Sequence, residues 1–270
     1  MVAFVIPFKP KRNSKDWEKD SYYLSATIHS ILHQTNHNFK IYVVLHDLPD
    51  TIIEHPQLSY ITFPSAYVDF DNIKDGQEQL KNNSWYSQKD IEYIFDQGRK
   101  QMFGASLAKQ SGCEFVMCID ADDIVCKDLV DYIHHHKQQI KAGWYVDKGF
   151  FYLTGKNVFV RQPYSMNVYN GSVYIIRSEF IPQFDPMTLE VSACNFFSFH
   201  PLVPQFVFDT YKVKLIPLPF YATIVQINNL NWWKTTGRIT GTTMKGRIKY
   251  YLRRVYFTYN IKKRFAFEKH

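Results

Sequence analysis

Three carboxylates follow an apolar run near the middle of the chain, at Asp120, Asp122 and Asp123. The run, residues 115–119, is apolar throughout, as expected of a strand buried on both faces. Because side chains alternate along a strand, Asp120 and Asp122 should point the same way where it ends. Ligands of open α/β sheets bind beyond the carboxyl ends of strands, and paired carboxylates there suit Mg²⁺ or Mn²⁺, which can bridge a diphosphate. The alternative is a solvated turn, because Asp-x-Asp is common by chance.

Strand-like and helix-like segments alternate around this motif. The expected strands of the first half are residues 2–6, 40–45 and 115–119. Residues 25–34 and 98–111 lie between these strands, and each shows the spacing of apolar residues that is typical of a helix. Such alternation predicts an α/β fold with a parallel sheet and crossover helices. Four further segments complete the prediction: a loop with a short helix at 72–90, a helix at 129–140, and strands at 150–153 and 173–176.

The composition indicates a folded protein rich in aromatic rings, with 46% hydrophobic and 17% aromatic residues among 270. Its four cysteines match no zinc-binding spacing and are too sparse for a disulfide framework, which favours a reducing compartment. The first residues form a strand-like run rather than a signal peptide, and no 18 apolar residues follow one another. We therefore expect a cytoplasmic protein that is soluble or peripheral on the inner face of the cell membrane.

The net charge of +7 comes from the end of the chain. Residues 236–270 contain ten Lys or Arg residues and one acid, whereas the other 235 residues contain 22 bases and 24 acids. Apolar residues recur there at helical spacing: Ile248, Tyr251, Leu252, Val255 and Tyr259. The pattern predicts a basic amphipathic helix that binds an anionic membrane surface; the alternative is a helix packed on the domain. Nucleic acid is a poorer candidate, because the body of the chain is slightly acidic and holds no recognition motif.

Four segments of the chain, residues 5–7, 30–35, 41–44 and 119–123, occur in the order and at the approximate spacing of a known family. The chain resembles family 2 glycosyltransferases of the GT-A fold, well over residues 1–130 and loosely over 170–225. The resemblance implies a Rossmann-like, mixed and mostly parallel sheet flanked by helices. It also implies a glycosyltransferase domain over 1–235, with a nucleotide-sugar half at about 1–125 and an acceptor half at about 126–235, before the basic extension at 236–270.

The activity implied by the resemblance is transfer of a hexosyl group from a nucleoside-diphosphate sugar, with a UDP-sugar and inversion favoured. The acceptor would be a hydroxyl of a glycan or a lipid-linked molecule, in the assembly of cell-surface polysaccharide or lipopolysaccharide. By the same resemblance Asp122 would hold Mn²⁺ or Mg²⁺, and Asp120 would contact the ribose or the metal. Pro7 and Ala121 belong to the matched segments around the nucleotide.

Further nucleotide contacts are expected from two charged segments. Asp47 follows the second strand, where the family carries an Asp that contacts the base; the alternative is an Asp that opens a turn before Pro49. Asp96, Arg99 and Lys100 precede the metal-binding strand, in a region that approaches the nucleotide in the family, and a cation there could pair with the base or the phosphates. The alternative is a helix start with Asp96 as N-cap and two solvated cations.

Inverting transfer needs a base for the acceptor hydroxyl. The family often has an Asp or Glu roughly where His200 stands here. An imidazole could serve as the base or as a third metal ligand, and otherwise His200 caps a helix. Asp147, Asp185 and Glu190 are rival bases. A retaining enzyme would need none, so the stereochemistry stays open.

Two other functions compete with sugar transfer. A nucleotidyltransferase also places metal-binding carboxylates at strand ends, but it usually has a Gly-rich basic loop after the first strand. Residues 9–12 are basic and contain no Gly, which counts against this alternative. The other competitor is a catalytically inactive, membrane-associated scaffold of the same fold.

Overall fold

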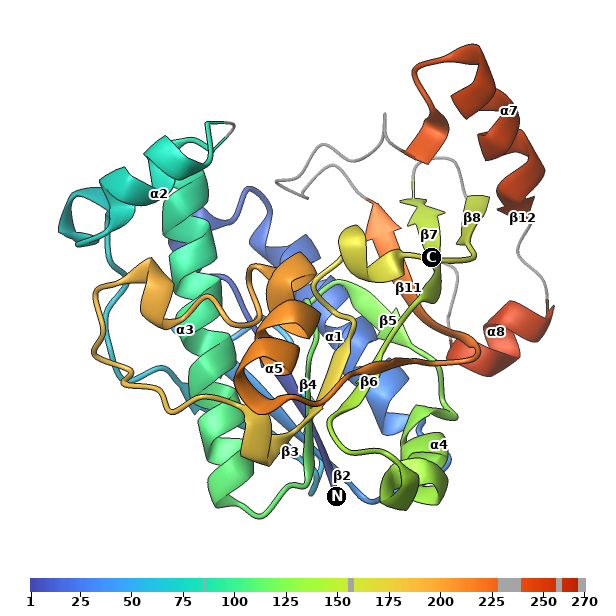
Figure 1. Ribbon diagram of the computed structural model, residues 1–270, viewed down its shortest axis with the longest axis horizontal. Helices are drawn as coiled ribbons and strands as arrows, with labels where there is room; N and C mark the ends of the chain where they lie inside the picture. The colour runs from blue at the N-terminus through green and yellow to red at the C-terminus, as the bar shows by residue number, and fades with distance from the viewer. Residues whose placement is uncertain (85, 155–157, 228–238, 256–258, 267–270) are drawn as a thin grey trace.

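The computed structural model describes residues 1–84, 86–154, 158–227, 239–255 and 259–266 (Figure 1). A sheet of seven strands forms its centre. The four adjacent strands β4, β1, β2 and β3 are parallel, and β9 runs antiparallel beside β4. This sheet confirms the expected mixed α/β fold with a mostly parallel sheet. In spatial order its strands are β10 (Ile216–Pro217), β6 (Gly143–Tyr145), β9 (Tyr174–Arg177), β4 (Phe115–Cys118), β1 (Val2–Pro7), β2 (Phe39–Leu45) and β3 (Leu58–Thr62).

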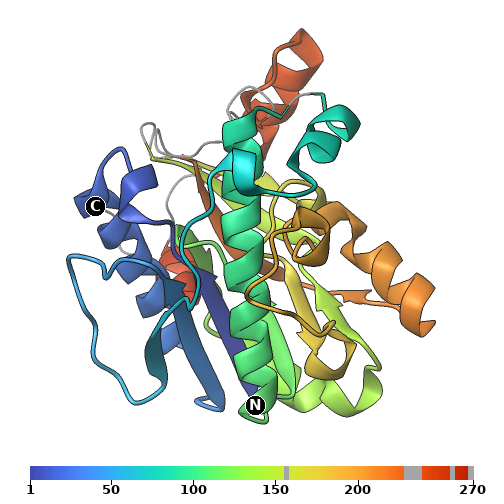
Figure 2. The same ribbon diagram turned by 90° about the vertical axis from the view of Figure 1, so that its left-hand side faces the viewer.

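Helices cover both faces of this sheet (Figures 1 and 2). The long helix α3 (Gln88–Gln110) packs on β1 and β2 at Gly104, where a Cβ atom would lie 2.4 Å from Val5 Cγ1. The helix α1 (Trp17–Leu32) lies on the other face. Shorter helices follow along the chain: α2 (Gly76–Asn82), α4 (Leu129–His136) and α5 (Val203–Tyr211).

The helices α1 and α3 begin eight and ten residues before the expected starts at 25 and 98. In α1 the Asp16 carboxylate caps the helix by accepting a hydrogen bond from the Lys19 N–H (3.0 Å). In α3 Ser87 and Asp90 form a capping box. The missed turns of both helices hold apolar residues such as Tyr23 and Ile94, and the caps at Asp16 and Ser87 are the signals that mark the true helix starts. The expected helix at 129–140 ends as an α-helix at His136, and a 3-10 turn, Lys137–Gln139, follows it.

A second sheet stands beside the first, and the carboxylate turn connects the two. After β4 the chain passes through residues 119–122 and enters β5 (Asp123–Val125), which the sequence did not predict. The expected strand 150–153 is the end of β7, and β8 and β11 were not expected. In spatial order the strands are β12 (Arg254–Val255), β8 (Val158–Gln162), β7 (Lys148–Leu153), β11 (Tyr221–Ile227) and β5.

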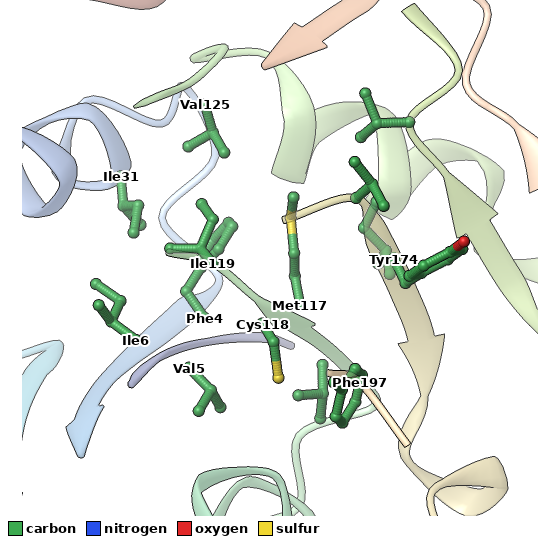
Figure 3. Packing of buried hydrophobic residues seen from close by; sticks show 14 of the residues in the cluster. Phe4, Val5, Ile6, Ile31, Met117, Cys118, Ile119, Val125, Tyr174 and Phe197 are labelled. Atoms are coloured by element: carbon green, nitrogen blue, oxygen red, sulfur yellow. The ribbon is translucent and has the colours of Figure 1, made fainter. Parts of the chain in front are cut away.

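The core lies on both faces of the central strands. Figure 3 shows Val5 and Cys118 on one side, together with Phe197, and Phe4 and Met117 on the other. All of these residues are at least nine-tenths buried. Strands that are covered on both faces read as continuous apolar runs, which explains why β1, β2 and β4 were visible in the sequence. The rigid strand ends in turn fix the position of the carboxylates.

The C-terminal extension is not the single helix that its spacing predicts. The helix α7 (Met244–Arg253) ends at β12, which pairs antiparallel with β8, so Val255 lies in a strand. The helix α8 (Tyr259–Phe265) follows, with Ile261 and Phe265 buried. The expected domain boundary at 235 lies outside the described residues. No helix within the described ranges has the length and apolar character needed to cross a membrane.

Candidate active site

A pocket of about 490 Å³ opens where β1 and β4 end, a volume typical of small-molecule sites. This edge of an open α/β sheet is where ligands bind. Seven of the nine predicted site residues line the pocket: Pro7, Asp96, Lys100, Asp120, Ala121, Asp122 and His200. The structure therefore brings together residues that the sequence separates by almost 200 positions.

Hydrogen bonds from two distant segments hold the carboxylate turn. Gln97 of α3 donates from Nε2 to Asp120 Oδ1 (2.7 Å), and the Asp120 backbone N–H donates to Ser172 Oγ (2.7 Å). Asp123 is buried and accepts a hydrogen bond from Asn170 Nδ2 (2.7 Å). Asp122 lines the pocket beside them. Hydrogen bonds within the protein thus fix the shape of the turn.

The clustered carboxylates oppose one another's ionisation. Burial, and then the charge of Asp122, raise the pKa of Asp120 to about 7 against the hydrogen bonds from Gln97 and Ser172. Burial and the charges of Asp122 and Asp120 raise the pKa of Asp123 well above its usual value. A site with excess negative charge and carboxylate oxygens suits a hard divalent cation.

Asp120 and Asp122 are the residues that would hold such a cation. In the part of the chain that the structure describes, no three His, Cys, Asp or Glu side chains form a metal-binding group. A third protein ligand is not required for Mg²⁺, which is usually held by one or two carboxylates together with phosphate oxygens and water. The donor set therefore fits the expected metal, and the role of His200 as a third ligand stays a prediction.

Without a divalent cation, we expect the protein to lose stability as the pH rises from about 4 to about 7. The pKa of Asp120 is higher in the folded protein than the value of about 3.9 expected after unfolding. Between these values the folded state binds more protons, so the free energy of unfolding falls as the pH rises. Urea unfolding at several pH values should show a flatter profile for Asp120→Asn than for the wild type. The exposed Asp50→Asn is the control, and equal profiles for wild type and Asp120→Asn would contradict the assignment.

His200 lines the same pocket as the carboxylates. Its Nδ1 donates a hydrogen bond to the Asn167 carbonyl (2.8 Å), because a carbonyl oxygen can only accept. Burial lowers the pKa of His200 although this hydrogen bond opposes the shift. The neutral ring therefore carries its lone pair on Nε2. A Cβ atom at Gly171 would lie 3.9 Å from His200 Cδ2 and 4.0 Å from Asp120 Oδ2, so both side chains approach the same point.

The structure separates His200 from the rival bases. Among the residues that it describes, Asp147, Asp185 and Glu190 do not line the pocket, whereas His200 does. Asp147 accepts a hydrogen bond from the Ser165 backbone N–H (2.6 Å), and Asp185 accepts one from the Met187 backbone N–H (2.9 Å). His200 also does not cap α5 with its side chain, since its ring bonds to the 167 carbonyl.

Asp96 and Lys100 form a buried ion pair at the pocket wall. Lys100 Nζ lies 2.7 Å from Asp96 Oδ2 and donates a further hydrogen bond to the Phe8 carbonyl (2.8 Å). His46 Nε2 lies 2.9 Å from the other oxygen of Asp96. Burial opposes the charge of Asp96, yet Lys100 and His46 hold its pKa below the usual value. Asp96 is therefore not the N-cap of the helix and Lys100 is not a solvated cation, which corrects the alternative reading of this segment.

Arg99 and Asp47 lie outside the set of residues that line the pocket. Arg99 is fully buried, donates to the Ala66 carbonyl (2.8 Å) and stacks on two phenylalanine rings. Asp47 accepts a hydrogen bond from the Lys11 backbone N–H (2.8 Å) and so joins the loops after β1 and β2. Their contacts here are with the protein, and their part in nucleotide binding stays a prediction.

Several pocket residues were not predicted from the sequence. Gln97, Asn170 and Ser172 hold the carboxylates, and Lys9 lines the pocket with its Nζ 2.9 Å from Asp20 Oδ1. One signal could have revealed Asn170 and Ser172. The strand β9 pairs antiparallel with β4, so the residues before β9 must lie beside the residues after β4.

No protein-family model and no curated protein sequence matches the chain. Solved structures do resemble it. One is S. aureus TarS 1–349 in complex with UDP, at 12% identity and a TM-score of 0.46 over 84% of this chain and 60% of that chain. The complex of TarS 1–349 with UDP-GlcNAc has 11% sequence identity and a TM-score of 0.46, over 92% of this chain and 78% of that chain. A proposed nucleotide-diphospho-sugar transferase from Desulfovibrio desulfuricans G20 has 10% sequence identity and a TM-score of 0.37, over 93% of this chain and 91% of that chain. The chain thus spans less than two thirds of the first of these structures.

Proposed function

We propose that the chain is a metal-dependent glycosyltransferase of the GT-A fold. It would transfer a hexosyl group from a nucleoside-diphosphate sugar, a UDP-sugar by preference, to a hydroxyl of a glycan or lipid-linked acceptor in cell-surface polysaccharide or lipopolysaccharide assembly. One observation carries the proposal: Asp120 and Asp122 lie on a fixed turn at the carboxyl end of β4 and line a pocket at the end of the parallel sheet. The sequence resemblance of residues 1–130 supports the same activity.

The donor would lie with its diphosphate at the carboxylate turn. A divalent cation held by Asp120 and Asp122 supplies Lewis-acid stabilisation of the diphosphate leaving group. Lys15 lines the same pocket and would add positive charge near the phosphates, whereas the charge of Lys9 is paired with that of Asp20. The hydrogen bond from Gln97 holds the Asp120 carboxylate, and the hydrogen bond from the Asp120 backbone N–H to Ser172 holds its backbone, so little reorganisation is needed when the donor binds.

The acceptor would enter on the side of His200. The Nε2 lone pair of the neutral ring can take the proton of the attacking hydroxyl, while the Asn167 carbonyl fixes the ring through Nδ1. Val168 and Tyr169 line the pocket beside it and are 55% and 40% exposed, which offers an apolar and aromatic surface for a sugar ring. Because a base is available for the acceptor hydroxyl, inversion is the favoured outcome.

Donor binding should raise the melting temperature, and it should do so more strongly with metal. At about 100 times Kd a ligand adds about 2.7 kcal/mol to the free energy of unfolding, which corresponds to a shift of several degrees. We expect this shift for UDP and a UDP-sugar with Mn²⁺, and a much smaller one without metal or in Asp122→Asn. A larger shift with a nucleoside triphosphate would favour a nucleotidyltransferase. Binding without any Mn²⁺-dependent hydrolysis of UDP-sugars would favour the inactive scaffold.

A further inference from the structure

The helix α7 carries an apolar face that the described protein leaves exposed. Met244 and Leu252 are each 81% exposed, Tyr251 is 64% exposed and Ile248 is 56% exposed. Their spacing of i, i+4, i+7 and i+8 places all four side chains on one face of the helix. Large apolar side chains that gather on one exposed face mark an interaction surface.

The opposite face fixes α7 to the protein. Tyr250 is buried, and Arg253 donates hydrogen bonds to Gln162 Oε1 (3.0 Å) and to the Tyr164 hydroxyl (3.1 Å). Thr243 Oγ1 caps the start of the helix by accepting from the Gly246 N–H (3.1 Å), and β12 pairs with β8 at its end. Because both ends and one face are held, the apolar face has a defined outward orientation.

Cations border the apolar face on both sides. At about 100° per residue, Lys245 and Arg247 fall on either side of the four apolar positions. Both side chains are exposed, and no ion pair among the described residues involves α7. The sequence contains no acid between 236 and 267. Long basic side chains beside an apolar face can reach lipid phosphates while the apolar side chains enter the membrane interface.

We propose that α7 docks the protein on an anionic lipid bilayer. Met244, Ile248, Tyr251 and Leu252 enter the interface, and Lys245 and Arg247 pair with lipid phosphates. The structure restricts the proposed membrane-binding surface to α7 and not to the whole basic extension, because α8 packs into the protein. Phe265 of α8 is 1% exposed and its ring lies 5.9 Å from that of Phe150.

The position of α7 relative to the pocket gives the docking a consequence. In both views α7 stands at the end of the molecule opposite the N-terminus, the end where the parallel strands have their carboxyl ends (Figures 1 and 2). The helix adjoins β8, which lies two strands from β11, and Ile227 of β11 lines the pocket. A lipid-linked acceptor would then be presented near the pocket. This consequence rests on the proposed function, whereas docking itself does not.

Co-sedimentation of the full chain with vesicles tests the docking without any donor or acceptor. We expect binding to vesicles of phosphatidylcholine mixed with phosphatidylglycerol, at least about tenfold weaker binding to phosphatidylcholine alone, and a decrease with salt. Ile248→Ser with Leu252→Ser should reduce the partition coefficient at least about tenfold, since both side chains lose their apolar insertion. These residues are exposed, so the melting temperature should not change.

A matched pair of charge variants separates α7 from general attraction. Each cation near an anionic surface strengthens binding about fivefold, so Lys245→Ser with Arg247→Ser should weaken vesicle binding about 30-fold. Lys262→Ser with Lys263→Ser removes the same charge from exposed positions of α8 and should weaken binding less than about fivefold. Equal losses in the two variants, or no binding of the wild type at low salt, would overturn the proposal. Self-association that Leu252→Ser abolishes, without vesicle binding, would assign the face to a second copy and overturn it too.

Discussion

Asp122→Asn should lower the rate of sugar transfer, and of donor hydrolysis without acceptor, by at least about 100-fold. The amide has nearly the shape of the carboxylate but lacks the charge that would hold the divalent cation. Metal-ion stabilisation of a leaving group contributes several kcal/mol, and each 1.36 kcal/mol is a factor of ten in rate. Release of the nucleoside diphosphate from a UDP-sugar with Mn²⁺, measured with and without acceptor, gives the turnover. Titration with Mn²⁺ gives the metal affinity of the same variant.

Two controls separate loss of chemistry from loss of structure. Asp122→Asn removes a negative charge that raises the pKa of Asp120, so the metal-free variant should be at least as stable as the wild type at neutral pH. Asp131→Asn removes a carboxylate from an exposed position on α4 and should leave turnover unchanged. Wild-type turnover together with wild-type metal affinity in Asp122→Asn would refute the role of the carboxylate turn.

The strands that position the site were the most predictable part of the fold. β1, β2 and β4 are buried on both faces, so their sequences are continuous apolar runs and their ends were predicted within about two residues. The strand β5 has three residues and begins with Asp123, so it resembles a turn rather than a strand. The strands β8 and β11 contain polar residues, Gln162 and Gln226, that are buried in the fold although their residue type does not indicate it.

The candidate site was predictable where its residues adjoin in sequence. Asp120 and Asp122 share one turn, and a strand end fixes their direction. Charge alone, in contrast, does not tell which side of a helix faces a ligand: Lys100 lines the pocket while Arg99, its neighbour, contacts the loop at Ser65 and Ala66. Asn170 was also missed, because its contact with Asp123 follows only once the pairing of β9 with β4 is recognised.

His200→Ala should lower the rate of sugar transfer about 10²- to 10⁴-fold, the usual contribution of a general base. Nδ1 carries the proton of the neutral ring and donates it to the Asn167 carbonyl, so the Nε2 lone pair can accept a proton from the acceptor hydroxyl. Donor binding without metal and the melting temperature should change little, because the carboxylate turn is held by other residues. Single-turnover kinetics with donor and acceptor, beside thermal unfolding, measure both. His135→Ala, on the exposed side of α4, is the matched control.

The pH profile and the metal affinity decide what His200 does. Burial lowers the pKa of His200, and a base works in its neutral form, so the wild-type rate should fall as the pH drops through this lowered pKa. His200→Ala should lose that acidic limb and keep its Mn²⁺ affinity if the residue is the base. If His200 is a metal ligand instead, the affinity for Mn²⁺ should fall with the rate. A loss of tenfold or less, with an unchanged acidic limb, would remove His200 from the chemistry and return the search for a base to Asp147, Asp185 and Glu190, which would then have to reach the pocket by a rearrangement of their loops.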